Sequence, residues 1–278
     1  MGILFGLLAA VCFALADFVV THATRHVGVL QALFAIQLFG VLVVGAVLII
    51  MQAPPPGSLA VWALMGGISL INFVGTLLLY RAFAIGTLSL VSPIASGFAV
   101  VTAVLALASG ERPPILTLVG TSALIVGVIV VARARGVAGA SSLAGLPEAL
   151  GASICLGIYF WALNRITPTL GAIWPVWTTR LVQLLCAFPI LSIRGPFMLR
   201  KTWQAAPLLL LAAIFDSGAL LAFNLGIGQT YTTIATALTS LYSAVTVLLA
   251  WLFLRERLTI GQWMGVGAIL LGVLMVSI

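Results

Sequence analysis

The sequence predicts an all-α integral membrane protein whose ten transmembrane helices form two inverted five-helix repeats around a central cavity. Three observations support this fold class. The 278-residue chain is 63% hydrophobic and only 6% charged, which leaves too little polar surface to cover a water-soluble globule. Ten apolar stretches are each long enough to cross a bilayer. The two halves of the chain repeat one pattern of residues.

The ten stretches each hold about 20 mostly apolar residues, the number that a helix needs to cross a hydrocarbon core of roughly 30 Å. They lie at 2–22, 28–51, 58–81, 87–108, 115–133, 146–165, 170–193, 204–228, 231–253 and 260–278. The first stretch is expected to remain as a helix and not to be cleaved as a signal peptide, because no basic residue precedes its apolar run.

The internal repeat aligns residues 142 to 145 positions apart. The matched pairs include Leu8 with Leu150, Phe18 with Phe160, Glu111-Arg112 with Glu256-Arg257, Gly120 with Gly265, and Gly127 with Gly272. Five crossings per copy oblige the second copy to enter the membrane from the opposite side, an arrangement typical of transporters. The predicted units are a first repeat over 1–135 and a second, inverted repeat over 145–278.

Basic residues are distributed unevenly between the two faces of the expected bundle. With ten crossings, both termini and the loops after the even-numbered helices share one face, which carries only Arg112 and Arg165. The opposite face carries nine basic residues: Arg25, Arg81, Arg133, Arg135, Arg194, Arg200, Lys201, Arg255 and Arg257. By the positive-inside rule the richer face is cytoplasmic, which predicts that both termini are extracytoplasmic in the plasma membrane, the inner membrane of a bacterium. Nucleic-acid binding is not expected, because the charges sit singly or in pairs at helix ends.

Polar side chains inside the helices mark the candidate site, because an unpaired polar group in hydrocarbon is expensive. In the third, fourth and ninth stretches they recur every three or four residues, so each set shares one helix face. A single hydroxyl can bond to a backbone carbonyl one turn earlier, but stripes on several helices together favour a shared polar cavity. The candidate cavity residues are Asn72, Thr76, Tyr80, Ser92, Ser96, Trp161, Arg180, Asp216, Asn224, Thr236, Thr239, Ser240 and Tyr242.

Three charged residues are expected within the membrane: Asp17, Arg180 and Asp216. A rise of about 1.5 Å per residue places Arg180 and Asp216 near the midplane, where each charge alone costs at least about 2.5 kcal/mol. The two residues fit a structural ion pair, an anchor for a charged or zwitterionic substrate, or a protonatable coupling site. Asp17 lies nearer the cytoplasmic end of its helix, and it is a candidate gate or coupling residue or else a snorkelling surface charge.

The end of each half resembles a known family. The two segments run from Ser92-Pro93 through Glu111-Arg112 to Val131, and from Leu241-Tyr242 through Leu254-Arg255-Glu256-Arg257 to Ile278. Over essentially its whole length the chain resembles the EamA type of the drug/metabolite transporter superfamily. The resemblance implies a ten-helix basket with a cavity lined mainly by helices one, three, four, six, eight and nine, and with helices five and ten at the periphery. Members are often described with both termini in the cytoplasm, whereas the charges of this chain predict the opposite.

The expected function is export of small polar metabolites, with amino acids the favoured class, by alternating access through the central cavity. Tyr80, Trp161 and Tyr242 would enclose an apolar side chain, while hydroxyls and Arg180 or Asp216 would meet the polar end. Efflux of lipophilic cationic drugs is the alternative, because an acidic residue in an aromatic pocket suits that task.

An intramembrane enzyme is a further alternative that the sequence disfavours. The histidines, His22 and His26, both lie in the first loop near the surface, and no set of residues has the spacing of metal ligands. No catalytic residue, cofactor or metal is therefore expected. The expected partners are a small-molecule substrate and the lipid bilayer, and the chain is expected to function as a monomer.

Overall fold

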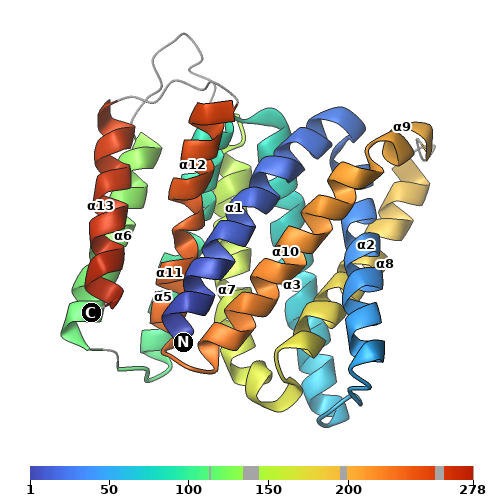
Figure 1. Cartoon of the computed structure of the whole chain (residues 1–278), viewed down its shortest axis with the longest axis horizontal. Coiled ribbons are helices and arrows are strands. Elements are labelled where there is room, and N and C mark those ends of the chain that lie inside the picture. The colour runs from blue at the N-terminus through green and yellow to red at the C-terminus, as the bar shows by residue number, and fades with distance from the viewer. Residues whose placement is uncertain (113, 134–143, 195–198, 254–259, 278) are drawn as a thin grey trace.

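The computed structural model describes residues 1–112, 114–133, 144–194, 199–253 and 260–277, and over these ranges the chain is a bundle of helices (Figure 1). Eight segments of the described chain are long and apolar enough to cross a membrane. Six of them are single helices: α1 (Gly2–Val27), α2 (Val29–Ile50), α3 (Leu59–Ile85), α7 (Leu146–Leu170), α8 (Ile173–Arg194) and α10 (Ala206–Ile227). A short helix, α9 (Leu199–Gln204), precedes α10.

The other two spans are each broken into two helices. The stretch expected as one helix over 87–108 is α4 (Leu88–Ala95) followed by α5 (Phe98–Ala108). Pro93 inside α4 has no backbone N–H to continue the helical ladder. Just after it, the Ser96 hydroxyl donates to the Pro93 carbonyl at 2.8 Å, and Gly97 N–H donates to Ile94 at 3.1 Å, a tighter turn than that of an α-helix.

The stretch expected as one helix over 231–253 is likewise divided, into α11 (Thr232–Ser240) and α12 (Tyr242–Phe253). No proline causes this break. Instead, Leu241 N–H donates to the carbonyl three residues earlier at 3.2 Å, and the Ser240 and Ser243 hydroxyls donate to carbonyls three residues earlier at 2.7 and 3.0 Å. Backbone groups around Leu241 are therefore satisfied by side chains and by a tight turn.

Helices α6 (Ile115–Arg133) and α13 (Ile260–Ser277) occupy the expected fifth and tenth stretches and pack against each other at one edge of the bundle (Figure 1). They are not among the eight candidate spans of the described chain. The described part of the chain thus has eight candidate spans, and ten crossings stay a prediction. The N- and C-terminal ends of the chain lie at the same end of the bundle (Figure 1).

Glycine allows α5 and α7 to approach closely. A Cβ atom on Gly157 of α7 would lie 2.5 Å from the Cβ of Val101 and 2.9 Å from the carbonyl oxygen of Phe98. The Thr102 hydroxyl of α5 donates to the Gly157 carbonyl at 2.9 Å. This contact fixes the first turn of α5 against the middle of α7, where both helices face the interior of the bundle.

Candidate functional site

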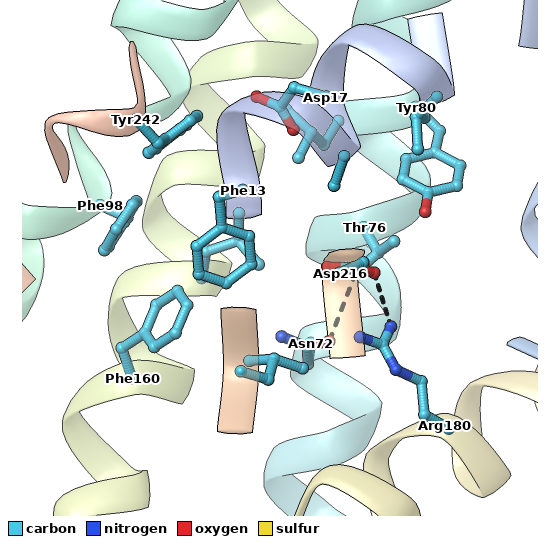
Figure 2. Close-up of a pocket in the computed structure, with 15 residues that line it drawn as sticks. Phe13, Asp17, Asn72, Thr76, Tyr80, Phe98, Phe160, Arg180, Asp216 and Tyr242 are labelled. Carbon is cyan, nitrogen blue, oxygen red and sulfur yellow. Dashed lines mark hydrogen bonds and ion pairs between the residues drawn. The ribbon is translucent and has the colours of Figure 1, made fainter. Parts of the chain in front are cut away.

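A pocket lies inside the bundle, and Figure 2 shows its lining. The space inside it that can hold the centre of a water molecule is about 60 Å³. Helices α1, α3, α5, α7, α8, α10 and α12 supply its lining, so both halves of the chain contribute. The resemblance to the EamA type implied that most of these helices line the cavity. It did not include α8, the expected seventh helix, which contributes Arg180.

One side of the pocket is aromatic. Phe13, Phe98, Phe160 and Tyr242 form it, and they lie together in Figure 2. The ring centroids of Phe98 and Phe160 are 4.7 Å apart, Phe98 stacks on Tyr242 at 6.1 Å, and Phe13 meets Phe160 edge to face at 6.2 Å. These separations are typical of favourable aromatic pairs. The surface suits the apolar part of a ligand.

The opposite side carries a buried ion pair. Arg180 of α8 is 2% exposed, and its Nη1 atom donates to Asp216 Oδ2 of α10 at 2.7 Å (Figure 2). The same Nη1 donates to the Gln37 side-chain oxygen of α2 at 3.0 Å. The Nε and Nη2 atoms of Arg180 are buried and have no hydrogen-bond partner among the described residues. The pair therefore forms as the sequence suggested, and part of the guanidinium is left unsatisfied.

A hydrogen-bonded group of neutral side chains continues this polar side. Asn72 and Thr76, one turn apart on α3, both line the pocket. The Thr76 hydroxyl donates to Asn72 Oδ1 at 3.3 Å, and Gln183 of α8 donates to both Asn72 and Thr76. Tyr80, one turn further along α3, lines the pocket with a buried hydroxyl that has no partner in the described part of the chain.

Asp17 of α1 lines the same pocket and is 7% exposed. The Ser92 hydroxyl donates to its Oδ2 atom at 3.4 Å, and Ser92 in turn accepts at its carbonyl from the Tyr242 hydroxyl at 3.4 Å. No described basic side chain forms an ion pair with Asp17. Its burial contradicts the interpretation as a snorkelling surface charge, and its position in the pocket is compatible with a gate or coupling role.

Several predicted site residues lie outside the pocket lining. The hydroxyls of Ser96, Thr236 and Ser240 donate to backbone carbonyls three or four residues earlier, at 2.8, 2.5 and 2.7 Å. Thr239 is buried, and its hydroxyl has no partner among the described residues. The Thr236, Ser240 and Ser243 hydroxyls of the expected ninth helix therefore serve local backbone bonding, whereas those of Thr232 and Thr239 have no partner among the described residues. Tyr242 is the predicted residue of that helix that reaches the pocket.

Asn224 and Trp161 also point elsewhere. The Asn224 side chain donates to the Ala172 carbonyl at 2.9 Å and ties α10 to the turn between α7 and α8. The Trp161 indole donates to the Ser109 hydroxyl at 3.0 Å, and Arg165 lies 4.7 Å from the centre of its ring. The neighbouring Phe160 faces the pocket instead.

Other residues of the site were not predicted from the sequence. Phe13, Phe98 and Phe160 are ordinary apolar residues in apolar helices, so nothing marked them except the match of Phe160 with Phe18 in the repeat. Gln37 and Gln183 could have been found, because an amide inside a membrane helix is as unusual as the hydroxyls that were chosen. Both are nearly inaccessible, at 0% and 1% exposed.

Some predicted features lie outside the described residues, namely Arg135 and the second Glu-Arg pair, Glu256-Arg257, with Arg255. Glu111 of the first pair is described. Its Oε2 atom accepts from the Thr233 hydroxyl at 2.9 Å and from the Thr233 backbone N–H at 3.4 Å, at the start of α11. Within the described ranges, no group of three or more His, Cys, Asp or Glu side chains could hold a metal ion.

The fold and the site define a class: a multi-pass helical membrane protein with an internal pocket to which both halves contribute aromatic and charged side chains. The chain belongs to the EamA-like transporter family, whose family model matches residues 1–133 and 143–278. This finding confirms the family that the sequence resembled. The family is one of transporters and not a class of enzymes.

Comparison with solved structures supports the fold. One crystal structure, described only as that of a protein, is similar to this chain with a TM-score of 0.74 and 15% sequence identity. The similarity covers 99% of this chain and 95% of that chain, so the whole bundle is shared. Among curated proteins, no match is found.

Proposed function

We propose that this protein exports small polar metabolites, most favourably amino acids with an apolar side chain, by alternating access through the pocket of Figure 2. The observation that carries the proposal is the division of that pocket into an aromatic side and a charged side. An apolar side chain would lie against Phe98, Phe160 and Tyr242, while the ammonium and carboxylate groups would meet Asp17 and Arg180.

The architecture behind this proposal is an inverted pair of five-helix units. Two observations support it. The family model matches the chain twice, once in each half. The helix breaks after α4 and after α11 are separated by the same offset as the two Glu-Arg pairs, so each half is interrupted at the corresponding place. Paired interruptions of this kind border the substrate site in transporters built from inverted repeats.

The proposed setting is the plasma membrane, the inner membrane of a bacterium, with both termini extracytoplasmic and the chain acting as a monomer. The uneven distribution of basic residues supports the orientation. Arg25, Arg81 and Lys201 lie at the ends of helices on the face opposite the termini, and Arg112 and Arg165 lie near the face that carries them.

Efflux of lipophilic cations is the second candidate, and one observation favours it. Asp17 is a buried carboxylate without an ion-pair partner in the described chain, and it shares its pocket with aromatic rings. A cation can interact with both. The buried guanidinium of Arg180 in the same pocket weighs against this candidate, because it would repel a ligand that carries only positive charge.

Flux into and out of vesicles containing the purified protein tests the two candidates. Labelled apolar amino acids, polar amino acids, sugars and cationic dyes would be compared at equal concentration. Faster exchange of apolar amino acids than of all other solutes supports the proposed function. Exchange of the dyes with no exchange of amino acids contradicts it and supports the second candidate.

A further inference from the structure

Gln183 fixes the orientation of two side chains in the pocket wall. It lies on α8 one turn after Arg180, is 1% exposed, and donates its amide hydrogens to Asn72 Oδ1 and to Thr76 Oγ1, the latter at 3.2 Å. Thr76 accepts this bond and donates its own hydrogen to Asn72 Oδ1 at 3.3 Å. Three side chains thus form a closed ring of hydrogen bonds between α3 and α8.

The ring determines which end of the Asn72 amide faces the pocket. Its oxygen accepts two hydrogen bonds, which uses both lone pairs. No hydrogen bond of the described chain uses the amide nitrogen, which carries two donor hydrogens. Asn72 lies between the aromatic side chains and Arg180 in Figure 2, so these donors face the space where a ligand would lie.

The unsatisfied Oε1 atom of Gln183 is an acceptor, but Gln183 is not among the residues that line the pocket. The unsatisfied groups of the lining residues Arg180 and Tyr80 can donate. Arg180 has free Nε and Nη2 atoms, and the Tyr80 hydroxyl has no partner among the described residues. Asp216 lies on the same side, but one of its oxygen atoms already accepts from Arg180. An unsatisfied buried donor is unfavourable, so several of them in one wall favour a ligand that brings acceptor atoms.

We infer that Asn72, Arg180 and Tyr80 form a subsite for the carboxylate of the substrate. Gln183 is then the positioning residue that keeps the amide hydrogens of Asn72 directed into this subsite. The inference rests on the proposed function and adds to it a requirement for the carboxylate group. A ligand that carries the same apolar chain and ammonium group but no carboxylate would leave these donors unpaired.

Three probes separate the groups of such a ligand: leucine, isoamylamine, which lacks its carboxylate, and isocaproate, which lacks its ammonium. Binding is measured as the rise in melting temperature of the full-length protein in detergent, and transport of leucine is measured in vesicles. For the wild type, leucine and isocaproate should stabilise the protein. Isoamylamine should bind at least about tenfold more weakly than leucine, because a site built to hydrogen-bond a group rejects an analogue that lacks it.

Two variants test the role of Gln183. Gln183→Met keeps the length of the side chain but removes both donors, so Asn72 can rotate and the preference for leucine over isoamylamine should fall to less than about threefold. Gln183→Glu offers only acceptors, which would turn the Asn72 donors away from the pocket, and isoamylamine should then bind as well as leucine or better. The exposed Gln204→Glu is the matched control and should keep the wild-type preference.

The outcomes distinguish this inference from the proposed function. Stabilisation by isocaproate and leucine without any transport of leucine would support the subsite and contradict the function. Transport of leucine with equal binding of isoamylamine by the wild type would support the function and overturn the subsite. An unchanged preference in folded Gln183→Met would overturn the positioning role, and a lack of binding by both carboxylate probes would overturn the whole inference.

Discussion

Arg180 is a residue whose burial costs free energy and whose hydrogen-bond donors can serve binding. Its guanidinium is 2% exposed, and such burial is tolerated only where the charge is paired and hydrogen-bonded. Nη1 meets both Asp216 and Gln37, yet Nε and Nη2 have no partner in the described chain. The residue is therefore held by one nitrogen, and its other two nitrogens have donor hydrogens without a protein partner in the described chain.

Removal of the carboxylate partner should destabilise the protein. Asp216→Asn leaves the Arg180 charge buried with only neutral partners, and breaking a buried pair in this way costs about 3–5 kcal/mol. Because Asp216 is 17% exposed, we expect the lower end, about 3 kcal/mol. Thermal unfolding in detergent measures the effect. Unfolding of Asp216→Asn at the wild-type temperature would mean that water reaches Arg180 and compensates the charge.

The choice between neighbouring residues could not be made from the sequence. Trp161 and Phe160 are adjacent on α7, and the structure directs the smaller ring into the pocket and the larger one to Ser109. Likewise, the stripe on α3 faces the pocket, whereas Thr236 and Ser240 bond to their own backbone. Both stripes have the same period. Packing of neighbouring helices decides the outcome, and a single sequence does not contain that information.

At the scale of elements, helix positions were predictable and helix breaks were not. Apolar length located the spans because the bilayer demands it. The break after Pro93 had a visible cause that suggested a bend, but the end of α4 at Ala95 and the start of α5 at Phe98 depend on bonds from Ser96 and Gly97. The break at Leu241 has no proline and arises from hydroxyls that compete with the helix ladder.

The close contact of α5 with α7 should be sensitive to one methyl group. Gly157→Ala would place a Cβ atom 2.5 Å from Val101 and 2.9 Å from the Phe98 carbonyl, so the helices must separate. Overpacking of this kind typically costs about 1–3 kcal/mol. The control is Gly218→Ala on α10, where a new Cβ meets no atom within 4 Å. The control should be neutral or stabilise the helix by about 0.5 kcal/mol.

Both variants can be compared by thermal unfolding in detergent. Because Phe98 and Phe160 line the pocket from the two helices that would separate, folded Gly157→Ala should also transport more slowly than Gly218→Ala. Equal stability and flux for the two variants would contradict the tight packing of α5 on α7.

Glu111 caps the start of α11 from the other half of the chain. It accepts from the Thr233 hydroxyl and backbone N–H, and a carboxylate at a helix N-terminus also interacts favourably with the helix dipole. Glu111→Ala should lower the free energy of unfolding by about 1 kcal/mol. The exposed neighbour Arg112→Ala serves as the control and should have little effect. Equal melting temperatures for Glu111→Ala and the wild type would exclude the capping role.

For the whole molecule, composition and the repeat predicted a multi-pass helical membrane protein, and the family match agrees. The sequence predicted no side-chain partners across the bundle apart from pairing of Arg180 with Asp216. Gln183 with Asn72, and Asp17 with Ser92, join residues from different helices that no local pattern connects. Such contacts depend on how the helices are rotated about their axes, which apolar length does not specify.

The orientation of the molecule can be tested with single cysteines in a cysteine-free background. Gln52 is exposed just after α2, which ends where the termini lie, and His26 is exposed in the last turn of α1, which ends on the opposite side of the bundle (Figure 1). If basic residues face the cytoplasm, an impermeant thiol reagent added to intact cells should label Gln52→Cys and should label His26→Cys only after permeabilisation. The reverse pattern would place both termini in the cytoplasm.

We expect substrate to pass through the pocket that holds Arg180 and Asp216, and counterflow of a labelled apolar amino acid in vesicles can measure this passage. The variant is Arg180→Gln combined with Asp216→Asn, because removal of both charges leaves no unpaired charge and spares the fold. We predict a double variant that melts within a few degrees of the wild type and shows less than about a tenth of its counterflow. Wild-type counterflow by the double variant, at matched protein levels, would show that substrate does not depend on this pair for its passage.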